Sequence, residues 1–538
     1  MFSALDWAVV AAYFLVVFAV AFNARLRARR TDEAQDYFLA GRNVGWFIIG
    51  ASIFASNIGS EHLVGLAGSG ATGGLAPAQF EILAGLILLL LGWLFAPFYL
   101  ASGVFTMPEF LERRFSPGAR TYLAAVSIVA YVLTKISVTI AAGAIVFETL
   151  MGVPFWTGAV IVVVATGVYT LWGGLRAVLY TDLVQLFVLV GGALAVTLIG
   201  LNAVGGWSGL TAALPAETFT VWRPISHPDY PWTGILFGAP ILAIWYWCTD
   251  QFIVQRTLSA RSVADARRAT IFAGFLKQLP LFVFVLPGVI AVALMQSGRM
   301  QFEGDQALPA LVQTLLPAGL RGLVAAGLLA ALMSSLSSVF NSCTTLISVD
   351  IVKRMRPTIS DHHLVTAGRV GVAAMTVFGL AWVPFMDVIS GQLFTYIQSV
   401  QAYIAPPIAV VFLLGVLWPR ANAAGAGAAL AAGAIAGVLR LTGEALLGDT
   451  AGGVIGAFVG VNFLHFAFLL FVVCGALMIA VSLATGAPDA AKTAGLTIAT
   501  TDRAAAAAPE SPRLDIVLSV LLVLLIGAIW AVFSSLVF

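Results

Sequence analysis

Charged residues and cysteines are scarce in this sequence. Only 10% of its 538 residues are Asp, Glu, Lys or Arg, whereas soluble proteins average about 25%. With 60% hydrophobic residues, this composition excludes an ordinary soluble domain, and the net charge of +2 gives no sign of a nucleic-acid partner. The three cysteines all lie in apolar runs, which argues against a disulfide framework or a cysteine metal site: Cys248, Cys343 and Cys474.

Apolar runs of about 20 residues recur along the whole chain, as expected for an all-α membrane protein that crosses the bilayer many times. We predict about 14 transmembrane helices. Their approximate ranges are 5–23, 44–70, 79–103, 121–148, 155–172, 177–203, 233–255, 268–296, 317–351, 365–385, 390–417, 422–440, 453–483 and 514–537.

The lysines and arginines predict the orientation of these helices. Most of them fall in alternate loops, beginning with "RLRARR" after the first span, and basic loops stay on the cytoplasmic side. We therefore expect a multi-pass protein of the plasma (inner) membrane, with both termini on the extracytoplasmic side.

Two segments do not read as membrane spans. Residues 204–232 are rich in tryptophan and proline and are expected to form an outward loop, and residues 485–512 are Ala/Thr/Pro-biased and predict a flexible cytoplasmic linker. Neither is a soluble domain, and the sequence shows no nucleophile–base pair or metal-binding cluster. An enzyme is therefore not expected.

One predicted span has a polar middle. The stretch "FASNIGSEHLVGLAGSG" (54–70) places Ser56, Asn57, Glu61 and His62 among glycines, although an ionised group at mid-bilayer costs at least ~2.5–3.5 kcal/mol. Glycines alone would suit close helix packing. With these polar residues beside them, the pattern favours a broken helix whose free carbonyls bind a hard cation such as Na⁺.

A second polar cluster and several isolated charges lie in other spans. The segment "AALMSSLSSVFNSCTT" from Ala330 carries too many hydroxyls for packing alone, although single serines often bond their own helix. Five ionisable residues lie in apolar runs, some near span ends where a position at the membrane interface is an open alternative: Glu81, Lys135, Asp182, Asp250 and Lys277.

Aromatic and amide side chains gather in "WYWCTDQ" (245–251) and "QLFTYIQSVQAY" (392–403). Ring faces stack on sugar C–H surfaces and amides bond hydroxyl groups, so the pattern indicates a pocket for a polyhydroxylated ligand. An aromatic belt at the membrane interface is the alternative for some of these rings.

The sequence resembles the sodium/solute symporter family, and within it the sodium/glucose cotransporters. The resemblance covers about residues 5–480 and rests on five motifs in the family's order: "ASNIGSEHLVGLAGSGA", "GGLRAVLYTDLVQ", "WYWCTDQFIVQR", "AALMSSLSSVFNS" and "SGQLFTYIQS…YIAPPIAVVFLLGVLW".

The resemblance implies a LeuT-like core of five-plus-five inverted repeats with broken helices. It places an extra helix and a basic loop at 1–43, the first repeat at 44–203 and the second repeat at 233–417. Peripheral helices follow at 418–484, and the last helix lies at 513–538.

The resemblance also implies three sets of site residues. The first sodium site would use Ala55, Ile58, Ala331, Ser334 and Ser335. A second site would use Ser56, Asp182, Ser337 and Ser338, unless Asp182 only pairs with a basic group. The solute contacts would be Asn57, His62, Glu81, Tyr246, Trp247, Lys277 and Gln398.

These features predict a sodium-coupled symporter of a hexose that works by alternating access, with two Na⁺ per sugar. The family resemblance at His62 favours glucose over galactose, whereas Ala243 stands where many family members have a polar sugar contact. A symporter of myo-inositol or, less readily, sialate is an alternative, as is a sugar-gated cation conductance or sensor on the same fold.

Overall fold

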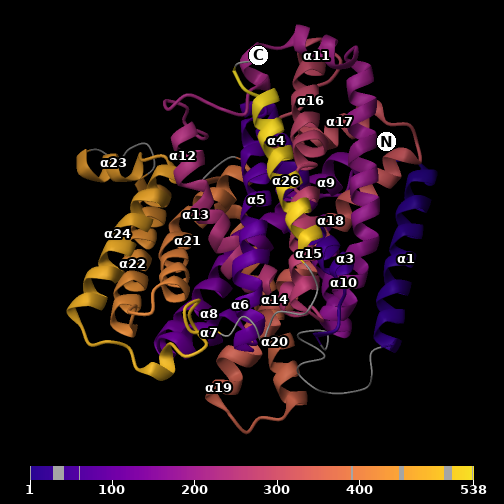
Figure 1. Cartoon of the computed structure of the whole chain (residues 1–538). Helices are drawn as coiled ribbons and strands as arrows, with labels where there is room; N and C mark the ends of the chain where they lie inside the picture. Colours follow the sequence, from indigo (N-terminus) through magenta and orange to yellow (C-terminus); the bar gives the residue numbers. More distant parts are fainter. Residues whose placement is uncertain are drawn as a thin grey trace.

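The computed structural model describes residues 2–27, 42–59, 61–388, 392–447, 453–501, 512–535 and 537. The chain is helical almost throughout these ranges (Figure 1). Membrane-length helices dominate it because an intramembrane backbone must satisfy its hydrogen bonds internally, which a helix does.

The helices of the first half of the chain are α1 Ala4–Arg27, α3 Trp46–Asn57, η2 Glu61–Leu66, α4 Ala67–Gly73, η3 Ala76–Ala78, α5 Gln79–Leu90, η4 Leu91–Phe95, α6 Ala96–Ser102, α7 Met107–Arg114, α8 Pro117–Tyr131, η5 Val132–Ile136, α9 Ser137–Met151, α10 Phe155–Ala203, α11 Gly206–Ala213, η6 Ala216–Phe219, α12 Trp232–Phe237, α13 Ala239–Ile244, η7 Trp245–Thr249 and α14 Gln251–Leu258.

The helices of the second half are α15 Val263–Leu276, η8 Leu281–Val285, α16 Leu286–Gln296, η9 Gly304–Gln306, α17 Ala307–Leu315, α18 Leu320–Thr345, η10 Leu346–Val352, α19 Lys353–Met355, α20 Asp361–Trp382, η11 Val383–Val388, α21 Leu393–Leu417, α22 Ala423–Leu447, α23 Gly453–Val459, α24 Phe463–Ala484, η13 Ala490–Lys492 and α26 Arg513–Val532.

The number of spans agrees closely with the sequence prediction. In the described ranges, 12 helices are long and apolar enough to cross a membrane, and one bent helix pair makes a thirteenth. The predicted span 177–203 is confirmed as the candidate span Val178–Ala203, whereas 155–172 corresponds to the shorter apolar helix Phe155–Gly167. Both lie in one continuous helix, α10, which runs on through Gly173 and Gly174. A glycine costs a helix only about 1 kcal/mol and does not by itself end it.

The predicted span 453–483 is also different in the structure. It divides into the short helix α23 and the long helix α24. Asn462 ends the break between them because its side-chain oxygen accepts hydrogen bonds from the backbone N–H groups of Leu464 (2.9 Å) and His465 (3.3 Å). This is a helix N-cap, which fixes where α24 starts.

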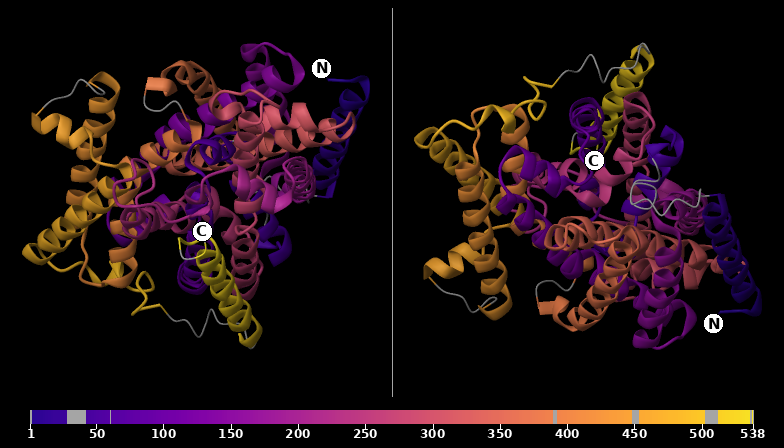
Figure 2. Two further views of the ribbon diagram at one scale, coloured as in Figure 1. Left: turned by 90° about the horizontal axis from the view of Figure 1, so that it is seen from above. Right: turned by 90° about the horizontal axis from the view of Figure 1, so that it is seen from below.

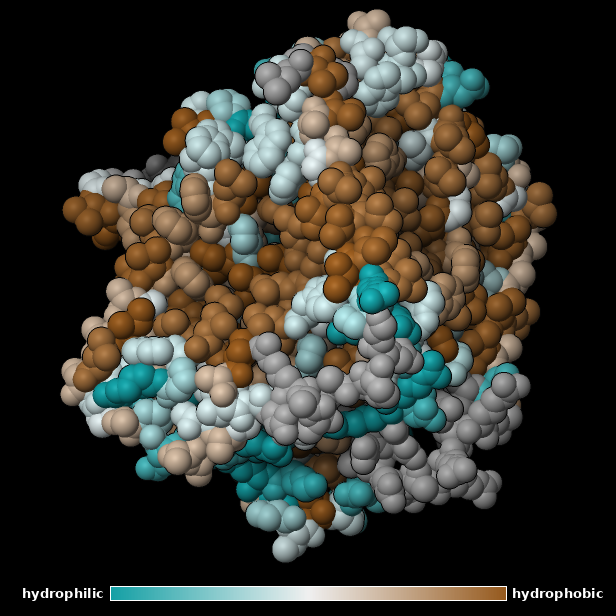
Figure 3. All heavy atoms as spheres, in the orientation of Figure 1, coloured by the Kyte–Doolittle hydropathy of each residue, from teal (hydrophilic) through white to brown (hydrophobic). Residues whose placement is uncertain are grey.

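The helices form a packed core with peripheral helices on opposite sides. Seen along the bundle, α1 lies at one edge and α22 and α24 lie at the other (Figure 2). Both chain termini lie towards the same end of the molecule in Figure 1. A broad apolar band covers its middle, while hydrophilic residues gather at the opposite, lower end (Figure 3).

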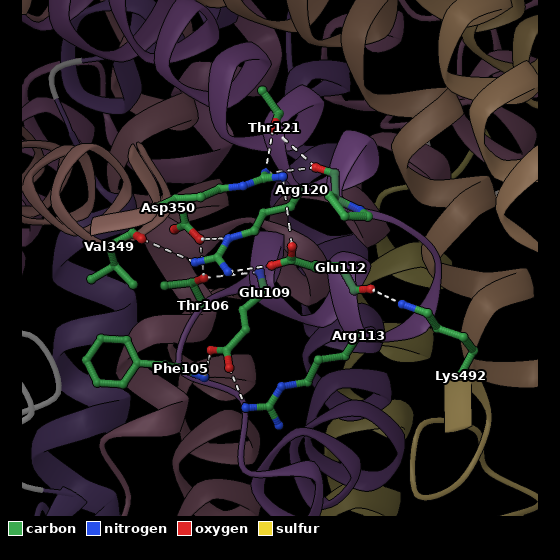
Figure 4. A network of polar contacts seen from close by, with 12 residues as sticks. Phe105, Thr106, Glu109, Glu112, Arg113, Arg120, Thr121, Val349, Asp350 and Lys492 are labelled. Atoms are coloured by element: carbon green, nitrogen blue, oxygen red, sulfur yellow. Dashed lines mark hydrogen bonds and ion pairs between the residues drawn. The ribbon is translucent and has the colours of Figure 1, made fainter. Parts of the chain in front are cut away.

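An ion-pair network holds that lower end together (Figure 4). The guanidinium group of Arg120, at the start of α8, contacts the carboxylates of Asp350 (2.8 Å) and Glu112 (2.6 Å), and Thr106 donates to Asp350 at 2.9 Å. Lys492 Nζ donates to the carbonyl of Glu112 at 2.9 Å. The network therefore joins α7, α8 and η10 to residues that the sequence assigned to a flexible linker.

Glycines allow two helices of the core to touch at their backbones. A Cβ atom on Gly288 of α16 would lie 1.9 Å from the carbonyl oxygen of Ala67 in α4, far inside van der Waals contact. Close approach of this kind replaces the hydrophobic driving force that is missing between helices in lipid.

We expect Gly288→Ala to lower the thermal stability of the purified protein in detergent, because overpacking a close contact typically costs about 1–3 kcal/mol. Gly427→Ala in α22 is the matched control, since a Cβ there meets nothing within 4 Å. Equal melting temperatures for the two variants would contradict the tight contact between α4 and α16.

Candidate sodium and solute sites

The first membrane span of the core is broken in its middle, as the sequence predicts. Helix α3 ends at Asn57, and the chain resumes as η2 and α4 at an angle of 61°. The N–H of Gly59 donates to the carbonyl of Asn57 at 2.9 Å, whereas in a continuous α-helix it would reach the carbonyl of Ala55. The break thus frees the Ala55 carbonyl from its helical bond inside the membrane.

Helix α18 lies against this break. The hydroxyl of Ser335 donates to the carbonyl of Ser56 at 3.0 Å, and the predicted sodium ligands of both helices are fully buried. Their exposed fractions are 0–1% for Ala55, Ile58, Ala331, Ser334 and Ser335. Carbonyl and hydroxyl oxygens at a broken helix are suitable ligands for Na⁺, so the residues present fit this cation.

Ser334 is predicted from the sequence as a ligand of the first sodium site, but its hydroxyl bonds a carboxylate instead. Its hydroxyl donates to Asp182 at 2.6 Å. The same carboxylate accepts from Ser52 at 2.5 Å and Ser56 at 2.9 Å. Three hydroxyls from two helices therefore converge on one buried carboxylate of α10.

Asp182 also has a cationic neighbour. The guanidinium group of Arg256 lies 4.0 Å from its carboxylate and donates to Ser52 at 3.0 Å and to Ser338. This is the pairing with a basic group that the sequence analysis kept as an alternative for Asp182. A buried carboxylate needs such a partner because the membrane interior solvates charge poorly.

The four predicted residues of a second sodium site are only partly together. Ser56 and Asp182 are in contact, whereas Ser337 donates to the carbonyl of Ser334 in its own helix and Ser338 accepts from Arg256. Ser52 and Arg256, which contact Asp182, were not among the predicted site residues. Ser52 could have been found, because it lies four residues before Ser56 on one helix face.

The predicted solute residues converge beside the break. Lys277 Nζ donates to both Asn57 and Glu81, and Nε2 of His62 donates to the Glu81 carboxylate at 3.2 Å. Asn57 in turn donates to the hydroxyl of Tyr246 at 3.0 Å. Five polar side chains from four separate segments of the chain thus form one hydrogen-bonded group.

Four of these side chains line one cavity of about 50 Å³. Lys277 is not among its lining residues and is held to it through Asn57 and Glu81. Trp247 belongs to its wall and lies 5.3 Å from Lys277 Nζ, measured to the ring centroid. Gln398 of α21 also lines the cavity, together with Phe394 and Gln401 of the same helix. Aromatic faces and amides with a few fixed charges suit a polyhydroxylated ligand.

The cavity contains a second ion pair that the resemblance did not assign. Lys135 Nζ lies 2.9 Å from Glu61 Oε1 and donates to the hydroxyl of Tyr246 at 3.2 Å. Both charged residues lie in π-helical turns, η2 and η5, which are wider than an α-helix and recur at functional sites. Tyr246 and Trp247 lie in a third such turn, η7. These π-helical turns were not predicted from the sequence.

Comparisons with known proteins show the family of this chain. Residues 37–433 match the family "Sodium:solute symporter family". The chain is 39% identical over 520 residues to the sodium/glucose cotransporter 4 of Danio rerio, covering 90% of this chain and 79% of the relative. It is also 39% identical over 533 residues to the sodium/myo-inositol cotransporter of Mus musculus, covering 90% and 74%.

Solved structures share the fold. A substrate-bound, outward-open Na⁺-coupled sialic acid symporter superposes with a TM-score of 0.76 at 22% identity, covering 91% of this chain and all of the other. The transporter Mhp1 in a closed conformation superposes with a TM-score of 0.53 at 14% identity, covering 85% and 97%.

A helical bundle with a broken membrane span and buried polar groups beside the break is typical of a secondary transporter. The chain belongs to the sodium:solute symporter family and is a multi-pass, sodium-coupled solute symporter of the sodium/glucose cotransporter subfamily. It is not an enzyme.

Replacement of Gln398 tests the solute cavity. We expect Gln398→Ala to weaken solute binding by ~1–3 kcal/mol, because the lost amide leaves a buried solute hydroxyl unpaired. Binding of a radiolabelled solute at saturating Na⁺ measures this change. Ser399→Ala, on the neighbouring position of α21 and outside the cavity lining, should keep the affinity of the unmodified protein; equal affinities for both variants would exclude Gln398 from the solute site.

Proposed function

We propose that this protein carries a hexose or a related cyclic polyol across the plasma membrane together with Na⁺, by alternating access, with both termini on the extracytoplasmic side. One observation carries the proposal: the solute cavity and the break in α3 share Asn57, which ends the helix and bonds both Lys277 and Tyr246. A cation held at the break therefore fixes a side chain of the solute cavity.

The charge of the cavity favours an uncharged solute. Its two carboxylates, Glu61 and Glu81, are each paired with a lysine, Lys135 and Lys277. An anionic solute such as sialate would need an excess of positive groups to replace its hydration. A neutral ring with several hydroxyls can instead donate to the carboxylates and accept from the ammonium groups.

The relatives support both a glucose and a myo-inositol substrate, since sodium/glucose and sodium/myo-inositol cotransporters are equally similar to this chain. Among the hexoses we take glucose as the first candidate because of His62, the position at which the family resemblance favours glucose over galactose. Myo-inositol is the competing candidate. Measuring how strongly each solute inhibits uptake of the other decides between them.

We expect an inward Na⁺ gradient to drive accumulation of radiolabelled glucose or myo-inositol into proteoliposomes, with no accumulation when K⁺ replaces Na⁺. Uptake independent of Na⁺ would reject coupled transport. Sodium currents that depend on the sugar, without sugar uptake, would instead support a sugar-gated conductance on the same fold.

We further propose two Na⁺ per solute, with the second ion at Asp182 and Ser56, where it would replace Arg256 as the partner of the carboxylate. Voltage adds about 2.3 kcal/mol per charge at 100 mV. At about 1.4 kcal/mol per decade, one Na⁺ then supports roughly 50-fold accumulation and two support on the order of 2,500-fold.

Reversal potentials in proteoliposomes measure this ratio. We expect two charges per solute for the unmodified protein and a lower ratio, or lost coupling, for Asp182→Ala. Thr344→Ala is the control on α18, because that hydroxyl donates only to the carbonyl of Phe340 in its own helix. A ratio of one in the unmodified protein would reject the second ion.

A further inference from the structure

The two oxygens of the Glu61 carboxylate have different surroundings. Oε1 is paired with Lys135 at 2.9 Å. Oε2 is buried and has no hydrogen-bond partner among the residues that the structure describes, and the side chain is only 2% exposed. A buried acceptor without a donor costs about 1–3 kcal/mol, and more when it is charged. Among the residues that the structure describes, nothing thus satisfies this buried negative oxygen.

That oxygen lies at the break of α3, next to α18. A Cβ atom on Gly59 would lie 2.1 Å from Glu61 Oε2 and 2.4 Å from the hydroxyl oxygen of Ser335. The two oxygens therefore border the same small space, which exists only because residue 59 is glycine. Ser335 uses its hydrogen to bond the Ser56 carbonyl, so its lone pairs are left to face this space.

A cation is the group that completes this arrangement. Buried charges in proteins are either paired or coordinate a metal, and hard cations take carboxylate, carbonyl and hydroxyl oxygens. Oε2 of Glu61 offers the carboxylate, the freed Ala55 backbone offers a carbonyl, and Ser335 offers the hydroxyl.

We propose that Glu61 Oε2 is a direct ligand of the Na⁺ at the first sodium site, and that Glu61 links this ion to the solute cavity through Lys135. The inference rests on the proposed sodium site at the break. It goes beyond that site, whose expected ligands are carbonyls and serine hydroxyls, by adding a full negative charge to it.

The link to the solute follows from the second oxygen. Lys135 bridges Glu61 Oε1 and the hydroxyl of Tyr246, and Tyr246 accepts from Asn57. Sodium on Oε2 draws negative charge from Glu61, which loosens its hold on Lys135 and leaves this ammonium group available to solute hydroxyls. Because such coupling is reciprocal, bound solute also strengthens sodium binding.

The test is sodium binding in the absence of solute, measured as Na⁺-dependent thermal stabilisation of the purified protein, with choline chloride to keep the ionic strength constant. We expect Glu61→Gln to raise the half-maximal Na⁺ concentration at least about tenfold, the change produced by ~1.4 kcal/mol. Glu81→Gln is the matched control: it makes the same chemical change in the same cavity, and its half-maximal Na⁺ concentration should stay unchanged while its solute affinity falls.

The variant Lys135→Met tests whether Glu61 is a sodium ligand or only the structural partner of Lys135. Removing the ammonium group takes a repelling cation away from the sodium site, so sodium should bind more tightly than in the unmodified protein. If Glu61 and Lys135 only stabilised the fold as a pair, Glu61→Gln and Lys135→Met would weaken sodium binding alike. That result would overturn the proposal.

The double variant Glu61→Gln/Lys135→Met excludes an indirect effect of the unpaired lysine. We expect its sodium binding to remain weak, because the ligand is still missing. Recovery to the unmodified value would show that the loss came from Lys135 alone and would overturn the proposal.

The response of the unmodified protein to Na⁺ distinguishes failure of the sodium site from failure of the role of Glu61 in it. If Na⁺ stabilises it and Glu61→Gln responds identically, Glu61 is not a ligand although the proposed function stands. If Na⁺ gives the unmodified protein no stabilisation beyond that of choline, the sodium site itself fails, and the role of Glu61 fails with it.

Discussion

The site depends on one constraint: every backbone polar group inside the bilayer needs a partner from the protein or from its cargo. The break after Asn57 interrupts the hydrogen bonds by which a helix satisfies its own backbone groups. Ser335 satisfies one carbonyl, and the freed carbonyl of Ala55 is left as a potential ligand. The interruption that makes α3 costly as a lipid-facing helix is therefore the feature on which the proposed sodium site depends.

The same constraint explains the charges around the break. Three ion pairs surround it, each with both members buried: Glu81–Lys277, Glu61–Lys135 and Asp182–Arg256. Pairing keeps the group neutral overall, which reduces the cost of placing ionised side chains in a medium of low dielectric constant. Since each lysine is held by a carboxylate, a solute with hydroxyl groups can exchange hydrogen bonds with the pair without leaving a charge unpaired.

The arrangement also connects the interior of the membrane with its charged end. Gln251, which begins α14 just after the aromatic turn η7, accepts from the backbone of Met107 at 2.9 Å. Residues 106–120 then carry the ion-pair network with Asp350 and Lys492 (Figure 4). A movement of α14 during transport would therefore have to rearrange contacts at this end.

The sequence by itself determined the membrane class, nearly all spans and the break near Gly59, and six of the seven residues predicted to contact the solute line one cavity. The length of apolar runs and the polar residues within them are local signals, and the bilayer makes them decisive because few structures can cross it.

Only the tertiary structure decided which polar groups meet. Ser334 turned to Asp182 and Arg256 reached Ser52, because these pairings depend on how α3, α10, α14 and α18 pack. The unsatisfied oxygen of Glu61 beside Ser335 likewise follows from the approach of two helices more than 270 residues apart. Such proximity leaves no pattern along the chain, because spatial contact between distant segments is set by packing and not by local spacing.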